Sequence, residues 1–179
     1  RIVVTSQASM AEMRLNAKVV GLTVPGLPPE ATQTVPLTLQ AKARLDTPGV
    51  PVDFHLRHPL LATDGKAVLT DRRQADIKLV LPDLKTLAAA AGQVVQGRAS
   101  LDLKLHQENR TWRVDADGKL ALSPGAGPVA LLGESAQLGA SAVFKNQDVS
   151  ISRLRLDGKN LRFSATGGYV ANRADLNWE

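Results

Sequence analysis

Cysteine is absent from the sequence, which excludes disulfide bonds, thiol nucleophiles and metal sites with cysteine ligands. The absence is compatible with the periplasm, where a stray thiol is a liability, but it does not select that compartment. Aromatic residues make up only 3% of the chain and are scattered along it. A surface that stacks nucleic-acid bases needs aromatic side chains close together, so we expect no nucleic-acid partner.

Long apolar segments are absent too. No stretch approaches the roughly 20 consecutive apolar residues of a membrane-spanning helix, and no secretory signal is visible. The chain begins at Arg1 beside the strand-like residues Ile2 to Val4, and it ends at Trp178 and Glu179 in another strand-like stretch. We therefore expect a segment of a longer protein whose signal or membrane anchor lies outside this sequence.

Charged residues form no long run of one sign. The formal charge is +5, from 22 Lys and Arg against 17 Asp and Glu. A basic balance could suit nucleic acid or an anionic membrane surface. Here, however, the charged residues alternate with leucine, valine and alanine, which is typical of the solvated faces of strands.

The alternation is clearest in segment 149–166. Apolar residues occupy every second position on both sides of the turn-forming segment 157–160, a pattern typical of two half-buried strands joined in a hairpin. The apolar parity slips after Ile151. One extra residue near Ser152 and Arg153 would restore the apolar face, so we predict a β-bulge there.

The same pattern predicts further strands along the chain. They cover residues 2–4, 12–20, 35–45, 50–56, 67–70, 75–81, 95–105, 112–122, 136–144 and 174–178. Segment 21–33 is predicted as a loop, the pair 64–65 as a turn and the pair 167–168 as a break. An apolar stripe with helical spacing predicts one short helix near 83–91. The turns are too short for parallel crossovers, so we predict an antiparallel meander of about ten to twelve strands.

Residues with catalytic or metal-binding chemistry do not converge in this pattern. A catalytic site needs polar groups gathered in an apolar pocket. Four aspartates fall at outward strand positions, where we expect them to be solvated: Asp53, Asp76, Asp102 and Asp115. His55 and His58 are the strongest metal candidates, but strand alternation places them on opposite faces and Pro59 follows. We therefore expect no enzymatic activity, no metal and no cofactor.

The continuous apolar faces allow two interpretations. They could form the core of a closed β-sandwich with a structural or adhesin-like protein-binding function, or they could line an open groove for acyl chains or for an unfolded client strand. Periodicity alone does not separate these alternatives. The candidate lining residues are Leu37, Leu39, Val52, Phe54, Ile77, Leu79, Leu101, Leu103, Leu105, Trp112, Val114, Leu120, Leu138, Ala140, Phe144, Ile151, Leu154, Leu156, Leu161 and Phe163.

A characteristic order of motifs begins at Leu79. It runs from Leu81-Pro82-Asp83-Leu84 and an alanine-rich helix, through Gly92, Gly97 and Leu131-Leu132-Gly133, to a strand ending at Phe144, the strand Val149–Leu156 and the pattern L-x-F-x-A-x-G at Leu161–Gly167. This order resembles the TamB-type translocation and assembly module proteins of Gram-negative bacteria, which belong to the AsmA-like superfamily. Residues 1–70 match only in their strand pattern.

The resemblance implies an all-β fold in which an antiparallel meander is rolled into an open β-taco groove with a hydrophobic interior. Residues 1–179 would form a single continuous segment of a longer protein, with the loop 58–66 as the candidate sub-boundary. The resemblance also implies a periplasmic location within a protein that is anchored in the inner membrane.

The function implied by the resemblance is not enzymatic. The groove would shield phospholipid acyl chains during transport between the inner and outer membranes, or would serve the translocation and assembly of outer-membrane proteins. An outer-membrane barrel partner of the TamA type would bind regions outside this segment. Open strand edges near Ile2–Thr5 and Ala174–Trp178 would leave backbone groups unpaired, so edge-to-edge self-association is also expected.

Overall fold

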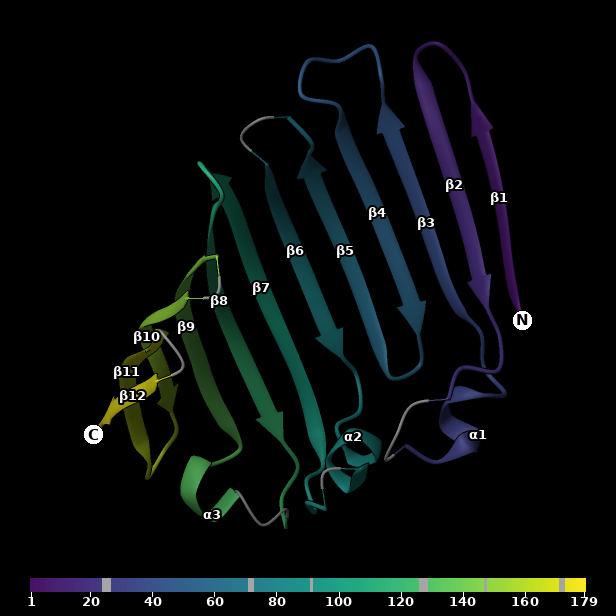
Figure 1. Cartoon of the computed structure of the whole chain (residues 1–179). Coiled ribbons are helices and arrows are strands. Elements are labelled where there is room, and N and C mark those ends of the chain that lie inside the picture. Colours follow the sequence, from purple (N-terminus) through teal and green to yellow (C-terminus); the bar gives the residue numbers. More distant parts are fainter. Residues whose placement is uncertain (24–26, 71–72, 91, 126–128, 147, 171–172) are drawn as a thin grey trace.

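One open antiparallel sheet accounts for most of the regular structure. The computed structural model describes the chain except residues 24–26, 71–72, 91, 126–128, 147 and 171–172. The sheet has twelve strands in sequence order, each hydrogen-bonded to the next, and β1 (Ile2–Ala8) and β12 (Arg173–Trp178) are its two edges (Figure 1). The predicted all-β antiparallel meander is confirmed. The alternative of a closed β-sandwich is wrong, because the single sheet remains open.

The strands between the two edges differ in length along the chain. They are β2 (Glu12–Val19), β3 (Leu37–Arg44), β4 (Pro51–His58), β5 (Leu61–Val68), β6 (Gln74–Leu81), β7 (Gly97–Glu108), β8 (Thr111–Leu122), β9 (Ser135–Lys145), β10 (Asp148–Asp157) and β11 (Arg162–Val170). The strands β2 to β6 have 8 residues each, whereas β7 and β8 have 12. The second half of the sheet therefore offers a wider surface on each face.

Short helices lie in the connections at one end of the strands. In the described part of the chain they are α1 (Pro29–Thr32), α2 (Lys85–Ala90) and α3 (Val129–Leu132), and all three gather at the same end of the sheet (Figure 1). The helix predicted near 83–91 is α2, whereas α1 lies in a segment predicted as a loop. Among the described residues, no helix has the length and hydropathy needed to cross a membrane.

The glycine-containing pairs predicted as a turn (64–65) and as a break (167–168) lie inside strands instead. Gly65 belongs to β5 and Gly167 to β11, and the loop expected at 58–66 is only a tight turn between β4 and β5. A Cβ atom at Gly65 would lie 2.1 Å from Cζ of Phe54 on the neighbouring strand. Glycine is needed here because the phenyl ring of Phe54 lies against the backbone of Gly65. Gly65 thus permits a close contact between β4 and β5, and the prediction of a turn at 64–65 was wrong.

The predicted β-bulge in β10 is confirmed. The register of β10 shifts against β9 between Ile151 and Arg153, and against β11 between Ile151 and Leu154. A bulge bends its strand and increases the local twist of the sheet. Figure 1 shows that the sheet curls round in this region, so that β10, β11 and β12 turn away from the direction of the earlier strands.

A small hydrophobic core lies inside the curl, at the helix end of the sheet. Leu122, Leu132 and Ala136 form a buried cluster in which α3 packs against β8 and β9. Half-buried apolar residues surround this cluster: Leu84, Val95, Leu120, Val129, Leu156 and Leu161. The cluster and its neighbours thus join segments from Leu84 to Leu161, and the buried cluster itself belongs to the second half of the chain.

Candidate functional site

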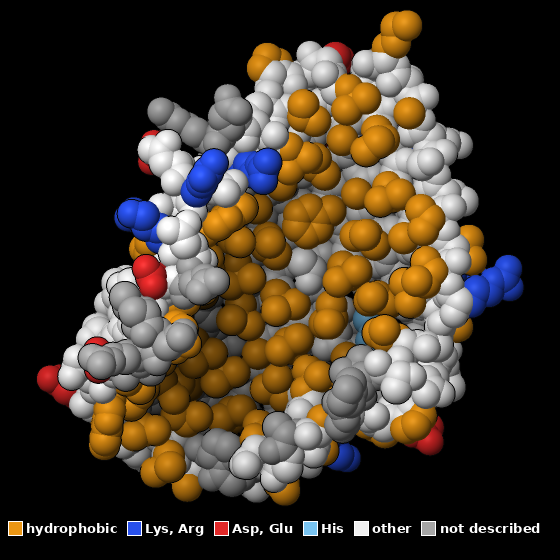
Figure 2. Space-filling view, viewed as in Figure 1, with side chains coloured by type: hydrophobic (Ala, Val, Ile, Leu, Met, Phe, Trp, Pro, Cys, Tyr) orange, Lys and Arg blue, Asp and Glu red, His pale blue; other side chains and the backbone are white. Residues whose placement is uncertain are grey.

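The strands sort their side chains onto two faces of opposite character. Because side chains alternate along a strand and aligned neighbours share a face, the register brings the apolar positions of the strands together. We call this apolar side the inner face and the opposite side the outer face. Figure 2 shows the inner face as a nearly continuous hydrophobic surface, hollowed where the sheet curls. We call this hollowed inner face the trough.

One row of cross-strand partners shows how the trough is lined. From β4 to β10 it consists of Phe54, Gly65, Ile77, Leu103, Ala116, Ala140 and Leu154. Small side chains stand beside large ones, because Ala116 is the partner of Leu103 and Ala140 is the partner of Leu154. An uneven apolar surface with unfilled space can bury the hydrocarbon of a ligand.

Ionisable side chains are almost excluded from the inner face. Among the described strand residues, no inner position carries Lys, Arg, Asp or Glu, and His58 is the one histidine there. Nδ1 of His58 accepts a hydrogen bond from the backbone N–H of Leu60 at 3.2 Å. Nε2 of His58 is buried without a hydrogen-bond partner among the described residues. Leaving a buried polar group without a hydrogen bond costs about 1–3 kcal/mol.

The structure brings the predicted lining residues together. All of them except Leu161 occupy inner strand positions according to the register. Leu161 precedes β11 and packs against the buried cluster at the helix end. Contact of these residues with a lipid or a client strand stays a prediction.

Several inner residues were missed as lining candidates. They include Met13, Leu15, Ala41, Ala116, Leu122 and Ala136. The same alternation that selected the others would have found them, because each lies in a predicted strand. Leu122 and Ala136 differ from the rest in that they belong to the buried cluster, and this role depends on α3 rather than on strand alternation.

The outer face carries rows of alternating charge. One row of cross-strand neighbours from β3 to β8 consists of Lys42, Asp53, Lys66, Asp76, Lys104 and Asp115. Slipping β6 by two residues against β7 would place Lys78 opposite Lys104, or Asp76 opposite Asp102. Such a slip leaves every side chain on its own face, so the apolar pattern cannot prevent it. The charged residues can prevent this slip, because like charges placed directly opposite each other are destabilising.

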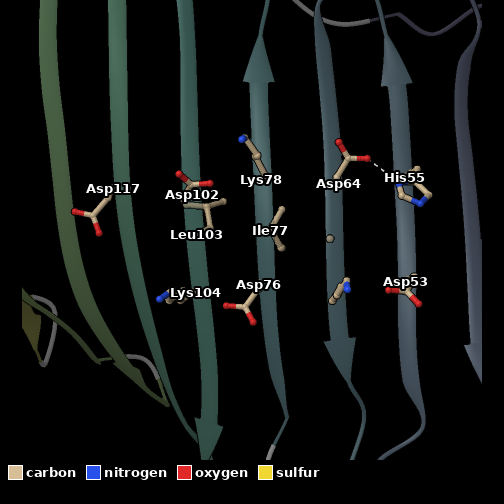
Figure 3. A pocket seen from close by; sticks show the side chains of 12 residues that line it. Asp53, His55, Asp64, Asp76, Ile77, Lys78, Asp102, Leu103, Lys104 and Asp117 are labelled. Carbon is tan, nitrogen blue, oxygen red and sulfur yellow. Dashed lines mark hydrogen bonds and ion pairs between the residues drawn. The ribbon is translucent and has the colours of Figure 1, made fainter.

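A shallow depression in the middle of the outer face is lined mainly by charged residues (Figure 3). There, Nδ1 of His55 lies 2.6 Å from Oδ1 of Asp64, and the guanidinium of Arg57 pairs with the same oxygen. The hydrogen bonds from His55 and Arg57 hold the pKa of Asp64 below its usual value. His58 lies on the inner face, so the predicted separation of His55 from His58 is confirmed.

A second carboxylate on the outer face is held by neighbouring cations. Oε2 of Glu12 in β2 lies 2.6 Å from Nζ of Lys42 in β3, and Arg14 pairs with the other carboxylate oxygen. Hydrogen bonds from Lys42 and then Arg14 lower the pKa of Glu12. The outer face therefore carries exposed ion pairs within and between strands, whereas the inner face is apolar.

Comparison with known proteins finds no match: no family model, no curated protein and no solved structure matches the chain. The resemblance to the TamB-type proteins therefore stays a prediction from the order of motifs. What the trough can bind has to be argued from its own geometry and chemistry.

Proposed function

We propose that the chain is a non-enzymatic segment whose trough shields the acyl chains of phospholipids. The observation that carries the proposal is the inner face, an open and hollowed surface with no Lys, Arg, Asp or Glu at any described inner strand position. A surface of this kind gains free energy by burying hydrocarbon, about 25 cal/mol for each Å² removed from water. It gives polar headgroups no charged partner along its floor.

Partial exposure of the lining supports binding rather than a purely structural role. Phe144 is 39% exposed and Leu154 is 38% exposed, although both lie on the apolar face. Large contiguous apolar surfaces are uncommon on proteins that act alone, and they mark sites where a ligand, a membrane or a partner binds. An open trough can also admit a lipid from the side, without the opening motion that a closed cavity requires.

The setting of this function follows from the resemblance to the TamB-type proteins. We propose that the segment lies in the periplasm as part of a protein anchored in the inner membrane, and that it contributes to phospholipid transport between the inner and outer membranes. A barrel partner of the TamA type would bind outside residues 1–179. The long apolar face and the in-order meander support this proposal, because further strands could extend the trough in the same direction.

Native mass spectrometry of the protein, purified without detergent, tests the proposal. We expect adducts with the masses of phospholipids, and their displacement by added fatty acid. A chain that is free of lipid and that also fails to bind a fluorescent fatty acid would overturn the proposal.

A second candidate function is the binding of an unfolded client strand. Ile2 is 70% exposed and Val4 56% exposed in the edge strand β1, and an exposed edge can recruit another strand by backbone hydrogen bonds. A peptide of alternating apolar and polar residues distinguishes the two candidates. Competition between this peptide and a fluorescent fatty acid would place the client in the trough, whereas independent binding would place it at the edge.

A further inference from the structure

The two long sides of the trough differ in what borders them. At the helix end, the buried cluster of Leu122, Leu132 and Ala136 and its apolar neighbours already fill the curl. Backbone hydrogen bonds from Lys159 to Leu132 and from Asn160 to Leu131 fix the β10–β11 connection against α3. Within the curl, the chain itself therefore covers the helix end of the trough.

The opposite side, at the tight turns, carries a row of aromatic residues. Cross-strand partners place Trp112 beside Phe144, Phe144 beside Val149, and Val149 beside Tyr169. These are three of the chain's six aromatic residues, counting three Phe, two Trp and one Tyr. Trp and Tyr favour the boundary between hydrocarbon and water because their rings are apolar and their N–H or O–H is polar.

The same row changes from apolar to basic toward β6. Gln107 lies opposite Trp112, and the backbone N–H of Gln107 donates a hydrogen bond to the carbonyl oxygen of Arg73 at 2.7 Å. Arg73 directly precedes β6 and stands two positions before the inner residue Ala75. Because the hydrogen bond from Gln107 continues the ladder to Arg73, alternation would place its side chain on the inner side of the sheet. Its exposed side chain is thus a cation at the margin of the apolar face.

A second exposed cation lies at the tip of the same margin. Arg110 occupies the β7–β8 turn with a φ of 64°, two residues before Trp112. Neither Arg73 nor Arg110 forms an ion pair within the part of the chain that the structure describes. Asp76, three residues after Arg73, and Glu108, two residues before Arg110, lie at outer strand positions. Figure 2 shows Lys and Arg side chains gathered along this edge of the hydrophobic surface.

We propose that this margin, formed by Arg73, Gln107, Arg110, Trp112, Phe144 and Tyr169, holds the phosphate of a glycerophospholipid whose acyl chains lie in the trough. The inference rests on the proposed function, and it adds an orientation and a headgroup chemistry. Guanidinium groups recognise phosphate by charge-assisted hydrogen bonds. Trp112 and Tyr169 would lie at the level of the glycerol, between the phosphate and the hydrocarbon.

The first experiment compares two lipids that share the same acyl chains, phosphatidylglycerol and diacylglycerol, each supplied to the chain in a non-ionic detergent. The wild-type chain should bind phosphatidylglycerol about fivefold more tightly, which corresponds to one exposed charge-assisted contact. The variant Arg73→Gln/Arg110→Asn should lose this preference but keep its affinity for diacylglycerol. Asn suits position 110 because it tolerates positive φ.

A matched control removes the same charge elsewhere. Lys18 and Lys119 are exposed at outer strand positions, and Lys18→Gln/Lys119→Gln should keep the preference for phosphatidylglycerol. If the control loses the preference equally, the attraction is a general effect of net charge and the headgroup site is overturned. Equal wild-type binding of both lipids would also overturn the headgroup site, while leaving the proposed function standing. Binding of neither lipid would overturn the proposed function itself.

The orientation has an independent readout in tryptophan fluorescence. In a Trp178→Phe background, Trp112 becomes the sole tryptophan, because the chain contains two. Phospholipids brominated near the carbonyl should quench Trp112 more strongly than phospholipids brominated near the terminal methyl group. A reporter at Leu101→Trp in a Trp112→Phe/Trp178→Phe background should show a smaller difference or the reverse order. Stronger quenching of Trp112 by the methyl-end bromines would overturn the proposed orientation.

Discussion

The two halves of the sheet follow the same alternation but differ in what covers the inner face. In the first half, β1 is exposed along its whole length, and Met13 in β2 is 43% exposed. In the second half, the longer strands curl, and Leu122 and Ala136 become 6% and 1% exposed. Because the strand pattern is alike in both halves, we attribute the burial of Leu122 and Ala136 to curvature and to α3. Burial is not confined to the curl, since Ala43 in β3 is only 4% exposed.

Unequal burial predicts unequal stability, and one leucine from each half tests this. Leu122→Ala removes a side chain from the buried cluster and should lower the free energy of unfolding by about 2–4 kcal/mol. Leu39→Ala, at a half-buried inner position of β3, should cost about half of that or less. Urea denaturation measures both. Equal losses would mean that the two halves are stabilised to the same extent.

The same comparison predicts where an inner charge stops lipid binding. Leu15 and Leu103 belong to the same cross-strand row, in the first and second half of the sheet. Leu103→Arg places a cation in the hollowed part and should weaken fatty-acid binding by tenfold or more, because desolvating it costs several kcal/mol. Leu15→Arg, on the flatter part, should weaken binding much less.

Two measurements keep this test interpretable. Leu103→Met retains an apolar side chain of similar size and should bind like the wild-type chain. The urea midpoint of each variant shows whether it is folded at the assay temperature. If the folded Leu103→Arg variant binds fatty acid normally, the hollowed part of the inner face is not the binding site.

The charged rows of the outer face give a third, smaller effect. Asp76 lies between Lys66 and Lys104 across the sheet. Asp76→Lys places three cations in a row and should cost about 1 kcal/mol at low salt, with a smaller cost at high salt because screening weakens exposed charges. Glu134→Lys changes the charge by the same amount outside the strands and should cost little. A loss for Asp76→Lys that is independent of salt would contradict the electrostatic explanation.

Which segments form strands, and which of their residues share the inner face, could largely be predicted from the sequence, because both follow from the alternation of apolar and polar residues. The bulge near Ser152 could also be predicted, because it leaves a visible slip in that alternation. The pairs at 64–65 and 167–168 misled the prediction, since glycine favours turns but also permits the close approach of Phe54 to Gly65. The choice depends on a partner strand, which local sequence does not reveal.

The candidate site could be predicted only in part, for a related reason. Alternation selects which residues share the inner face, but it does not reveal where that face is flat and where it is hollowed. The curl depends on the bulge in β10 and on the packing of Leu132 from α3 against β8 and β9. The row of Trp112, Phe144 and Tyr169 likewise depends on register, because these residues are far apart in sequence.

The open edge of β1, in the flatter half of the sheet, predicts self-association. Proline substitutions at the neighbouring residues Val3 and Val4 provide a matched test. Arg1 and Val20 exchange both backbone hydrogen bonds, so the backbone groups of alternate β1 residues bond to β2 and those of the others point to the open edge. The N–H of Val4 therefore faces outward. Val4→Pro should reduce self-association in sedimentation velocity without loss of stability, whereas Val3→Pro should break the β1–β2 ladder. Self-association that is unaffected by Val4→Pro would show that the contact lies elsewhere.

The smallest expected effect is a loss of stability in acid, which we expect in the first half of the sheet more than in the second. Asp64 and Glu12 have pKa values lowered by neighbouring cations, and both lie in the first half of the sheet. A carboxyl group whose pKa is lowered by folding contributes stability that is fully present above its unfolded pKa, about 4, and that is lost as the pH falls through the folded value. Both groups are exposed, so the contribution is small.

Hydrogen exchange measured strand by strand can detect an effect of this size. Lowering the pH from about 6 to about 3 should reduce the protection of β2 to β5, after correction for the intrinsic exchange rate. Protection of β8 and β9, which pack around Leu122 and Ala136, should change less. In the double variant Glu12→Gln/Asp64→Asn the first half should already be less protected at neutral pH, and acid should add little. A pH dependence that survives in this variant would assign the effect to other groups.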